Sequence, residues 1–200
     1  MNKESKFPSE IVELPSKGLL YSEESPLSSG KIEMKYMTAK EEDILTNQNY
    51  IERGVVIDKL LQALIVNKEI DYNNLLIGDK NALLIAARVL GYGKDYEFNY
   101  GDTKEIIDLT LLKEKDFDSK AFKKGKNEFT YTLPTTGVEL TYKLLTHGDE
   151  AKIQRELTGL RKINKEASPD LSTRLKYMIT AVNGDGETKT IRDFVDNEFL

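Results

Sequence analysis

The sequence predicts an α+β protein with an N-terminal extended arm and strand, a helical module, a small antiparallel β module and a C-terminal helical module. Three observations support this fold class. Prolines, glycines and serines are concentrated in residues 1–30, apolar residues recur at helical spacing in two separate stretches, and short alternating apolar and polar stretches lie between them. We place the modules at residues 1–37, 38–95, 96–145 and 146–200.

The arm precedes the first strand and holds three of the five prolines of the chain. It is too apolar for a freely solvated linker, so we expect it to lie against its own domain or against a neighbouring protein. Pro15 restricts Leu14 to extended conformations, and Gly18 can adopt a positive φ without steric cost, so a fixed turn is predicted there. Residues 31–37 then alternate polar and apolar side chains, as in a half-buried strand.

The second module is predicted to begin with a helix after Thr38, because Thr38 and Glu41 have the spacing of a capping box. A second helix is indicated within residues 55–66 by apolar residues at helical spacing. These residues are Ile57, Leu60, Leu61, Leu64 and Ile65.

A third helix is predicted over residues 80–90, with Asp79 as its cap and Gly91 or Gly93 able to end it in a left-handed turn. Its residues 82–87 are apolar on all sides, which is typical of a fully buried helix. We therefore expect this helix to form the centre of the first core.

The pattern changes to β-like stretches after Gly93. The four stretches are residues 96–100, 106–111, 128–133 and 138–145. The last two alternate apolar and polar residues around Pro134–Gly137, which is typical of a hairpin.

The C-terminal module is predicted to be helical. Residues 146–149 have the composition of a helix start, and Ser168–Pro169 predicts another, because proline is tolerated at the first helical position. The apolar face of that second helix is predicted to extend as far as Val182. It consists of Leu171, Leu175, Met178, Ile179 and Val182. A turn over residues 183–186 ends it. A last helix over residues 190–200 stops without a cap, so we expect that the natural chain can continue beyond Leu200.

Composition limits the classes of function. The chain has no cysteine, which excludes disulfides and thiolate zinc sites. Its formal net charge of −5 is unlike the positive charge of most proteins that bind the phosphate backbone of nucleic acids. We therefore expect no nucleic acid partner, and we interpret the lysines of residues 120–126 as a solvated loop. No apolar run approaches the length of a membrane span, and the N-terminus lacks the apolar centre of a signal peptide. These features predict a soluble protein made in the cytoplasm.

The motifs that carry chemistry are incomplete in this sequence. The single histidine, His147, has no Gly-x-Ser-x-Gly elbow to serve, and we interpret it as a residue near a helix start. Residues 183–194 lack the glycine and glutamate of a calcium loop, residues 91–95 lack the spacing of a phosphate loop, and Ser28–Lys31 lacks the companion motifs of acyl enzymes. The sequence therefore predicts no enzyme, no cofactor and no metal.

Five motifs occur in order along the chain. They are Glu13–Tyr21, Met37–Asp43, Val56–Leu61, Ile77–Asn81 and Leu90–Gly93. This ordered set resembles the baseplate hub protein family of T4-type contractile-tailed bacteriophages, most densely over residues 11–96. The resemblance implies a hub subunit or hub assembly protein without established catalysis. Some relatives carry Cys-x-x-Cys after the Gly-Tyr-Gly segment, where this chain has Phe98–Asp102, so a zinc-dependent property is not carried over.

Two roles fit the resemblance. The protein is either a structural component of the tail baseplate that stays in the virion, or an assembly chaperone that binds a tape-measure or hub protein and is absent from the mature particle. An extended arm suits the first role, and amphipathic C-terminal helices suit the second. Self-association stays open. The candidate partner-binding residues lie in the arm: Leu14, Pro15, Gly18, Leu19, Leu20 and Tyr21. Their alternative interpretation is that the arm packs on its own domain.

Overall fold

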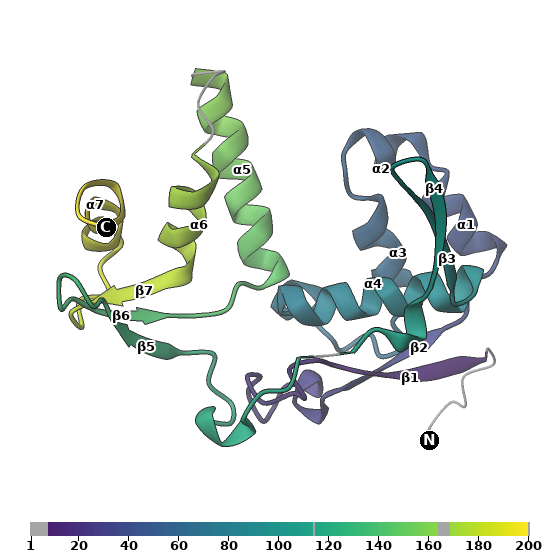
Figure 1. Ribbon diagram of the computed structural model, residues 1–200, viewed down its shortest axis with the longest axis horizontal. Helices are drawn as coiled ribbons and strands as arrows, with labels where there is room; N and C mark the ends of the chain where they lie inside the picture. Colours follow the sequence, from purple (N-terminus) through teal and green to yellow (C-terminus); the bar gives the residue numbers. More distant parts are fainter. Residues whose placement is uncertain (1–7, 114, 164–168, 200) are drawn as a thin grey trace. The chain divides into compact units, whose positions relative to one another are not determined.

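The computed structural model describes residues 8–113, 115–163 and 169–199 and has an α+β fold, as predicted (Figure 1). The chain forms two compact units. The N-terminal unit contains Met1–Asp71 and Gly78–Gly125, and the C-terminal unit contains Tyr72–Ile77 and Lys126–Leu200. The chain therefore passes from the N-terminal unit into the C-terminal unit at residues 72–77 and then returns to the N-terminal unit. The four predicted modules did not include this crossing.

The N-terminal unit combines a two-stranded antiparallel sheet, four helices and an antiparallel hairpin (Figure 1). The sheet consists of β1 (Ser9–Glu13) and β2 (Lys31–Lys35), joined by a segment that includes the short 3-10 turn η1 (Pro26–Ser29). The helices are α1 (Ala39–Leu45), α2 (Gln48–Glu52), α3 (Val56–Leu64) and α4 (Ile77–Tyr92). The hairpin is β3 (Asp95–Tyr100) and β4 (Thr103–Asp108), followed by the 3-10 turns η3 (Leu109–Leu111) and η4 (Ser119–Ala121).

The strand and the helix start around Thr38 follow the sequence pattern. Ile32 and Met34 of β2 are buried, as their alternation predicts, and Val12 of β1 pairs with Ile32. The Glu41 carboxylate accepts hydrogen bonds from the Thr38 amide at 3.0 Å and from the Thr38 hydroxyl at 2.6 Å. The strand β1 itself was not predicted, because Ser9–Glu13 has adjacent apolar residues and no alternation.

The core of the N-terminal unit is formed by the arm, β2, α3 and α4. The stripe of α3 is buried at Leu60, Leu61 and Leu64, as predicted. The interpretation of α4 as buried on all sides is wrong, because Leu84 and Ile85 are 40% and 39% exposed. One side of the helix, which includes Leu83 and Ala87, is buried, and the other described elements do not cover the side with Leu84 and Ile85.

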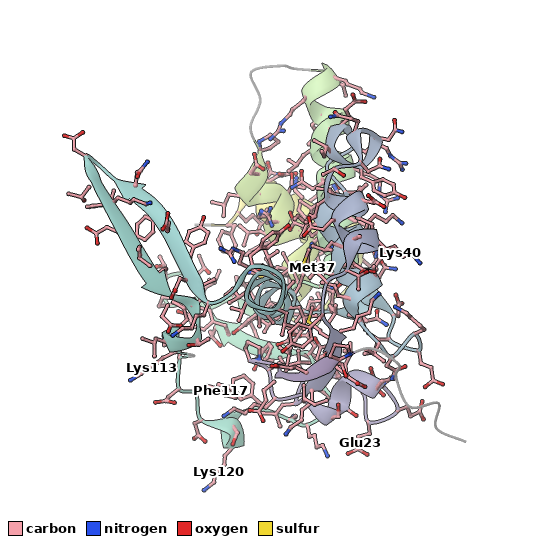
Figure 2. The ribbon with its side chains drawn as sticks, turned by 90° about the vertical axis from the view of Figure 1, so that its right-hand side faces the viewer. Glu23, Met37, Lys40, Lys113, Phe117 and Lys120 are labelled. Atoms are coloured by element: carbon pink, nitrogen blue, oxygen red, sulfur yellow. The ribbon has the colours of Figure 1, made fainter. Side chains whose placement is uncertain are left out.

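The β3–β4 hairpin stands out from the rest of its unit (Figure 2). All six residues of β3 are exposed, and so are all residues of β4 except Asp108. In Figure 2 the side chains of Lys113 and Lys120 also project outward from the segment that follows, whereas the Phe117 ring contacts Phe122 and lies 5.3 Å from the Lys17 ammonium. The segment 96–145, predicted as one β module, is therefore divided, because this hairpin pairs only with itself among the described residues.

The C-terminal unit packs three helices with a three-stranded antiparallel sheet in the order β5-β6-β7. The strands are β5 (Phe129–Thr132), β6 (Glu139–Tyr142) and β7 (Ile179–Val182). The helices are α5 (His147–Ile163), α6 (Asp170–Met178) and α7 (Thr188–Asn197), and the unit also contains the 3-10 turn η2 (Tyr72–Asn74). The predicted hairpin of β5 and β6 is confirmed by their pairing.

The prediction of one helix up to Val182 is wrong. The helix α6 ends at Met178, and Ile179–Val182 forms β7 on the edge of β6. Its residues Ile-Thr-Ala-Val are rich in β-branched side chains, which favour a strand once a partner strand is present. The predicted start of this helix falls partly on Ser168, which lies outside the described residues, while Pro169 is the N-cap of α6.

Candidate docking groove

The arm folds onto its own unit. Of the six candidate residues, Leu14, Leu20 and Tyr21 are 1%, 7% and 6% exposed. Gly18 is also buried, and Pro15 and Leu19 are half-buried. A side chain that fills the core of its own unit has no surface left for a partner, so the partner-binding interpretation does not hold for Leu14, Leu20 and Tyr21.

A buried carboxylate holds the arm against α4. Asp79 is 1% exposed, and its Oδ2 accepts hydrogen bonds from the Tyr21 hydroxyl at 2.5 Å and the Ser16 hydroxyl at 2.7 Å. Its Oδ1 accepts a third from the Ser16 amide at 3.0 Å. The predicted role of Asp79 as helix cap is therefore wrong: α4 begins two residues earlier, at Ile77, and the carboxylate binds the arm. Because buried carboxylates need such partners, this network fixes where the arm lies.

The predicted turn at Gly18 is confirmed. Gly18 has a φ of 75°, and a Cβ placed on it would lie 2.4 Å from the Ser28 carbonyl oxygen and 2.6 Å from the Gly30 amide nitrogen. A Cβ placed on Gly30, which has a φ of 69°, would lie 2.7 Å from the carbonyl carbon and oxygen of Lys17. Two backbone turns therefore cross at a distance that only glycine permits. This crossing fixes the path of the chain between β1 and β2.

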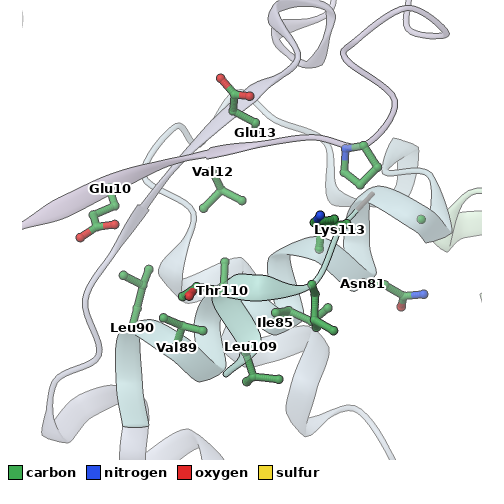
Figure 3. A pocket seen from close by; sticks show the side chains of 15 residues that line it. Glu10, Val12, Glu13, Asn81, Ile85, Val89, Leu90, Leu109, Thr110 and Lys113 are labelled. Carbon is green, nitrogen blue, oxygen red and sulfur yellow. The ribbon is translucent and has the colours of Figure 1, made fainter. Parts of the chain in front are cut away.

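An open groove of about 420 Å³ lies between β1, α4 and residues 109–113 (Figure 3). One wall is β1, through Val12 and Glu10, and Pro15 also lines the groove. The apolar side of α4 forms the floor, and residues 109–113 form the opposite wall. The floor and opposite wall include Ala82, Ile85, Ala86, Val89, Leu90, Leu109 and Leu112. Apart from the two glutamates of β1 and Lys113, the lining has no charged side chain.

The wall formed by β1 is the open edge of its sheet. Among the described residues, β1 pairs with β2 and with no other strand. The other edge of the sheet is occupied, because Met34 forms a bridge with Ile65 and the Val66 amide donates to the Glu33 carbonyl at 3.0 Å. An apolar groove therefore lies beside an unpaired strand, and sequence reasoning missed both. The sequence did contain one signal for the groove, because residues of α4 are apolar on all sides of the helix. We interpreted that pattern as a fully buried helix, whereas one side of α4 is exposed at the surface.

The β3–β4 hairpin offers a second exposed apolar surface on the same unit. Tyr96, Phe98 and Tyr100 alternate along one face of β3, and Ile107 lies opposite Tyr96 on that face. Their exposed fractions range from 36% to 76%. The Arg88 guanidinium lies 5.8 Å from the Tyr96 ring centre and donates to the Gly93 carbonyl at 2.9 Å. These contacts anchor the base of the hairpin at the Gly91–Asp95 segment, which ends α4 as predicted.

His147 has a structural position in the C-terminal unit. It is the first residue of α5, its amide donates to the Leu75 carbonyl at 2.7 Å, and its ring meets Tyr72 edge to face at 4.7 Å. This agrees with its predicted place at a helix start. Within the part of the chain that the structure describes, no group of three His, Asp or Glu residues is arranged to hold a metal ion.

One carboxylate joins the three helices of the C-terminal unit. Glu156 of α5 accepts two hydrogen bonds of 2.8 Å from the Arg192 guanidinium of α7 and one of 2.9 Å from the Tyr177 hydroxyl of α6. The Arg192 hydrogen bonds hold the pKa of the Glu156 carboxyl below its usual value; partial burial opposes the shift, and Tyr177 adds to it. This cluster is fully explained by helix packing.

The C-terminal unit also has an apolar depression of about 250 Å³. It lies over the sheet and the end of α6. Its lining is Tyr131, Leu133, Leu140, Tyr142, Leu175, Met178, Ile179 and Phe199.

Comparison with known proteins gives no relative: no family model, no curated protein and no solved structure matches this chain. None of the helices in the described residues is both long and apolar enough to cross a membrane.

Proposed function

We propose that this protein is a non-enzymatic structural component of a phage tail baseplate, in its hub region, and that it acts through protein–protein contacts. The ordered motifs of residues 11–96 support the biological setting through their resemblance to the baseplate hub family. One observation supports the mode of action: the apolar groove between β1, α4 and residues 109–113. Baseplate and other tail proteins are the partners in this proposal, and the virion is the location, after synthesis in the host cytoplasm.

The groove supports a protein partner more than a small ligand. Its lining is apolar apart from Glu10, Glu13, Lys113, Asn81 and Thr110 (Figure 3). Leu84, Leu111 and the aromatic face of the hairpin leave further exposed apolar surface on the same unit. Contiguous apolar surface that stays exposed in one chain is typical of a site that another chain covers.

The second candidate function is an assembly chaperone that binds a tape-measure or hub protein and leaves before the particle matures. The apolar depression of the C-terminal unit favours it, because a sheet and helix surface lined by Leu175, Met178 and Phe199 can receive the apolar face of a partner helix. The two functions use different units of the chain. Variants in each unit therefore separate them.

The test is co-purification from infected cells, with the partners identified by mass, using two variants of α4. Ile85 and Leu84 are adjacent and nearly equally exposed, at 39% and 40%, but only Ile85 lines the groove. Ile85→Lys is expected to release the baseplate partners, because a lysine in the apolar floor cannot be covered without losing its hydration. Leu84→Lys is the matched control and is expected to retain them.

Two results would contradict the proposal. Equal recovery of the partners with both variants would show that the groove does not bind them. Partners without any tail protein among them would remove the baseplate setting. If Met178→Lys in the C-terminal depression releases a tape-measure protein while Ile85→Lys does not, the chaperone function replaces the first.

A further inference from the structure

We infer that the groove binds its partner as an extended segment that adds a third strand to the β1–β2 sheet along the free edge of β1. This inference rests on the proposed function, because it specifies the form in which the protein partner enters the same site. The occupant is one segment of a partner protein, in strand conformation, with apolar residues at alternate positions.

The hydrogen-bonding phase of β1 identifies the groups that face the added strand. The Leu14 amide donates to the Gly30 carbonyl at 2.8 Å, and the Tyr36 amide donates to the Pro8 carbonyl at 3.1 Å. Backbone groups of even-numbered residues in β1 therefore face β2. Because the direction alternates in an antiparallel strand, the N–H and C=O groups of Ile11 and Glu13 face the open edge.

These groups select a strand over other occupants. Any molecule that fills the groove against β1 removes water from the backbone of Ile11 and Glu13. A helix or an apolar small molecule offers them no hydrogen bonds, and each buried polar group left without a partner costs about 1–3 kcal/mol. An extended segment supplies alternating donors and acceptors at the spacing of β1, so it satisfies all of them.

The side chains of β1 and α4 determine which positions of the partner segment must be apolar. Val12 and Glu10 share the face of β1 that looks toward α4, whereas Ile11 points to the opposite face with Glu33. Alternate side chains of the added strand would likewise point toward the floor, where Ile85 and Val89 are apolar. Apolar residues are therefore needed at every second position of the partner segment.

The charged residues of the groove determine which charges the partner segment needs at its two ends. Glu10 and Lys113 lie at opposite ends of the groove (Figure 3). Lys113 has no ion pair within the described residues, and Glu10 accepts a hydrogen bond from the Tyr36 hydroxyl at the exposed surface. The complementary segment carries a basic residue near Glu10 and an acidic residue near Lys113. The same charges discourage pairing with unselected strands.

The probe is a short acetylated peptide of alternating valine and threonine, with lysine at one end and glutamate at the other. Added to the full chain and followed by amide NMR, it is expected to shift the Ile11 and Glu13 amides at the open edge and slow their exchange with water. Two peptides are compared, N-methylated at the odd-numbered or at the even-numbered residues. One is expected to lose binding and the other to retain it, because only every second peptide N–H faces β1.

Ile11→Pro tests the edge from the protein side. Proline removes an N–H that no described residue uses, so the pairing with β2 stays intact, and the edge of a sheet tolerates proline. Ile11→Thr, which keeps the N–H, is the matched control. The proline variant is expected to bind the peptide about tenfold more weakly than the threonine variant, because it lacks one interstrand hydrogen bond.

Three results would overturn the inference: no shift of the Ile11 and Glu13 amides at millimolar peptide, equal loss of binding by both N-methylated peptides, or equal affinity of the two Ile11 variants. The N-methylation result also stands if Ile11→Pro fails to fold. The proposed function can fail independently of the inference. If the natural partner pairs with β1 as a strand but is absent from virions, the inference holds and the baseplate role does not.

Discussion

Gly18 shows how a single residue directs the arm toward the core of its own unit. The sequence predicted the turn from Pro15 and Gly18, since φ restrictions are local properties of these residues. It could not predict which surface the turn meets. That is decided by Asp79, whose carboxylate binds Ser16 and Tyr21 although they lie 63 and 58 residues away in the chain.

Gly18→Ala is expected to destabilise the protein by at least about 2 kcal/mol, because the new Cβ would combine an unfavourable positive φ with a clash against backbone atoms that cannot move aside. Gly54→Ala is the control. Gly54 has a similar φ of 66° with no atom within 4 Å of the added Cβ, so only the conformational cost of about 1 kcal/mol is expected. Urea denaturation measures both. Equal losses would show that the crossing at Gly18 is not a close contact in solution.

At the scale of elements, local patterns predicted some segments well and failed where tertiary partners decided. The capping box at Thr38, the stripe of α3 and the β5–β6 hairpin depend on neighbouring residues, and all three are found. The strand β7 depends on β6, about forty residues earlier, and its apolar residues fit a helical stripe as well as a strand. The stripe alone could not distinguish them.

Glu156 gives the C-terminal unit a predicted response to pH. Its pKa is lowered in the folded state mainly by Arg192, so its stabilising contribution is present above its usual pKa of 4.5 and is lost as the pH falls through the lower, folded value. Stability is therefore expected to decrease as the pH falls below about 4.5. Glu156→Gln is expected to make this decrease shallower and to cost about 1 kcal/mol at neutral pH, since the cluster is only partly buried.

Denaturation at a series of pH values measures this slope. Arg192→Met removes the other partner and is expected to give the same shallower slope, and combining it with Glu156→Gln should add little, because both changes remove one interaction. A Glu156→Gln variant with the wild-type slope would show that the Glu156–Arg192 pair does not act in solution.

For the whole molecule, the sequence predicted the class of fold, and its candidate residues lie in the unit that holds the proposed groove, although most of them do not line it. Leu14, Leu20 and Tyr21 are apolar because they fill the core, whereas Pro15 alone among the six candidate residues lines the groove. The groove brings together β1, α4 and residues 109–113, which are distant in sequence. No local pattern reports such a combination, so the site required the structure.

The division into two units also assigns the two candidate functions to different surfaces. The groove and the exposed hairpin belong to the N-terminal unit, and the depression beside Met178 belongs to the C-terminal unit. A permanent subunit needs its contact to persist in the finished particle, whereas a chaperone needs to release its client. Presence in the mature particle is therefore the property on which the two functions differ most.

Quantitative mass spectrometry of purified particles tests this most directly. In the proposed setting, phage particles would be purified, their baseplates isolated, and the amount of this protein compared with that of the established baseplate proteins. A structural subunit is expected in a fixed ratio that persists through further purification, and the Ile85→Lys variant is expected to be absent from the particles. A protein that is abundant in infected cells but absent from purified baseplates would contradict it.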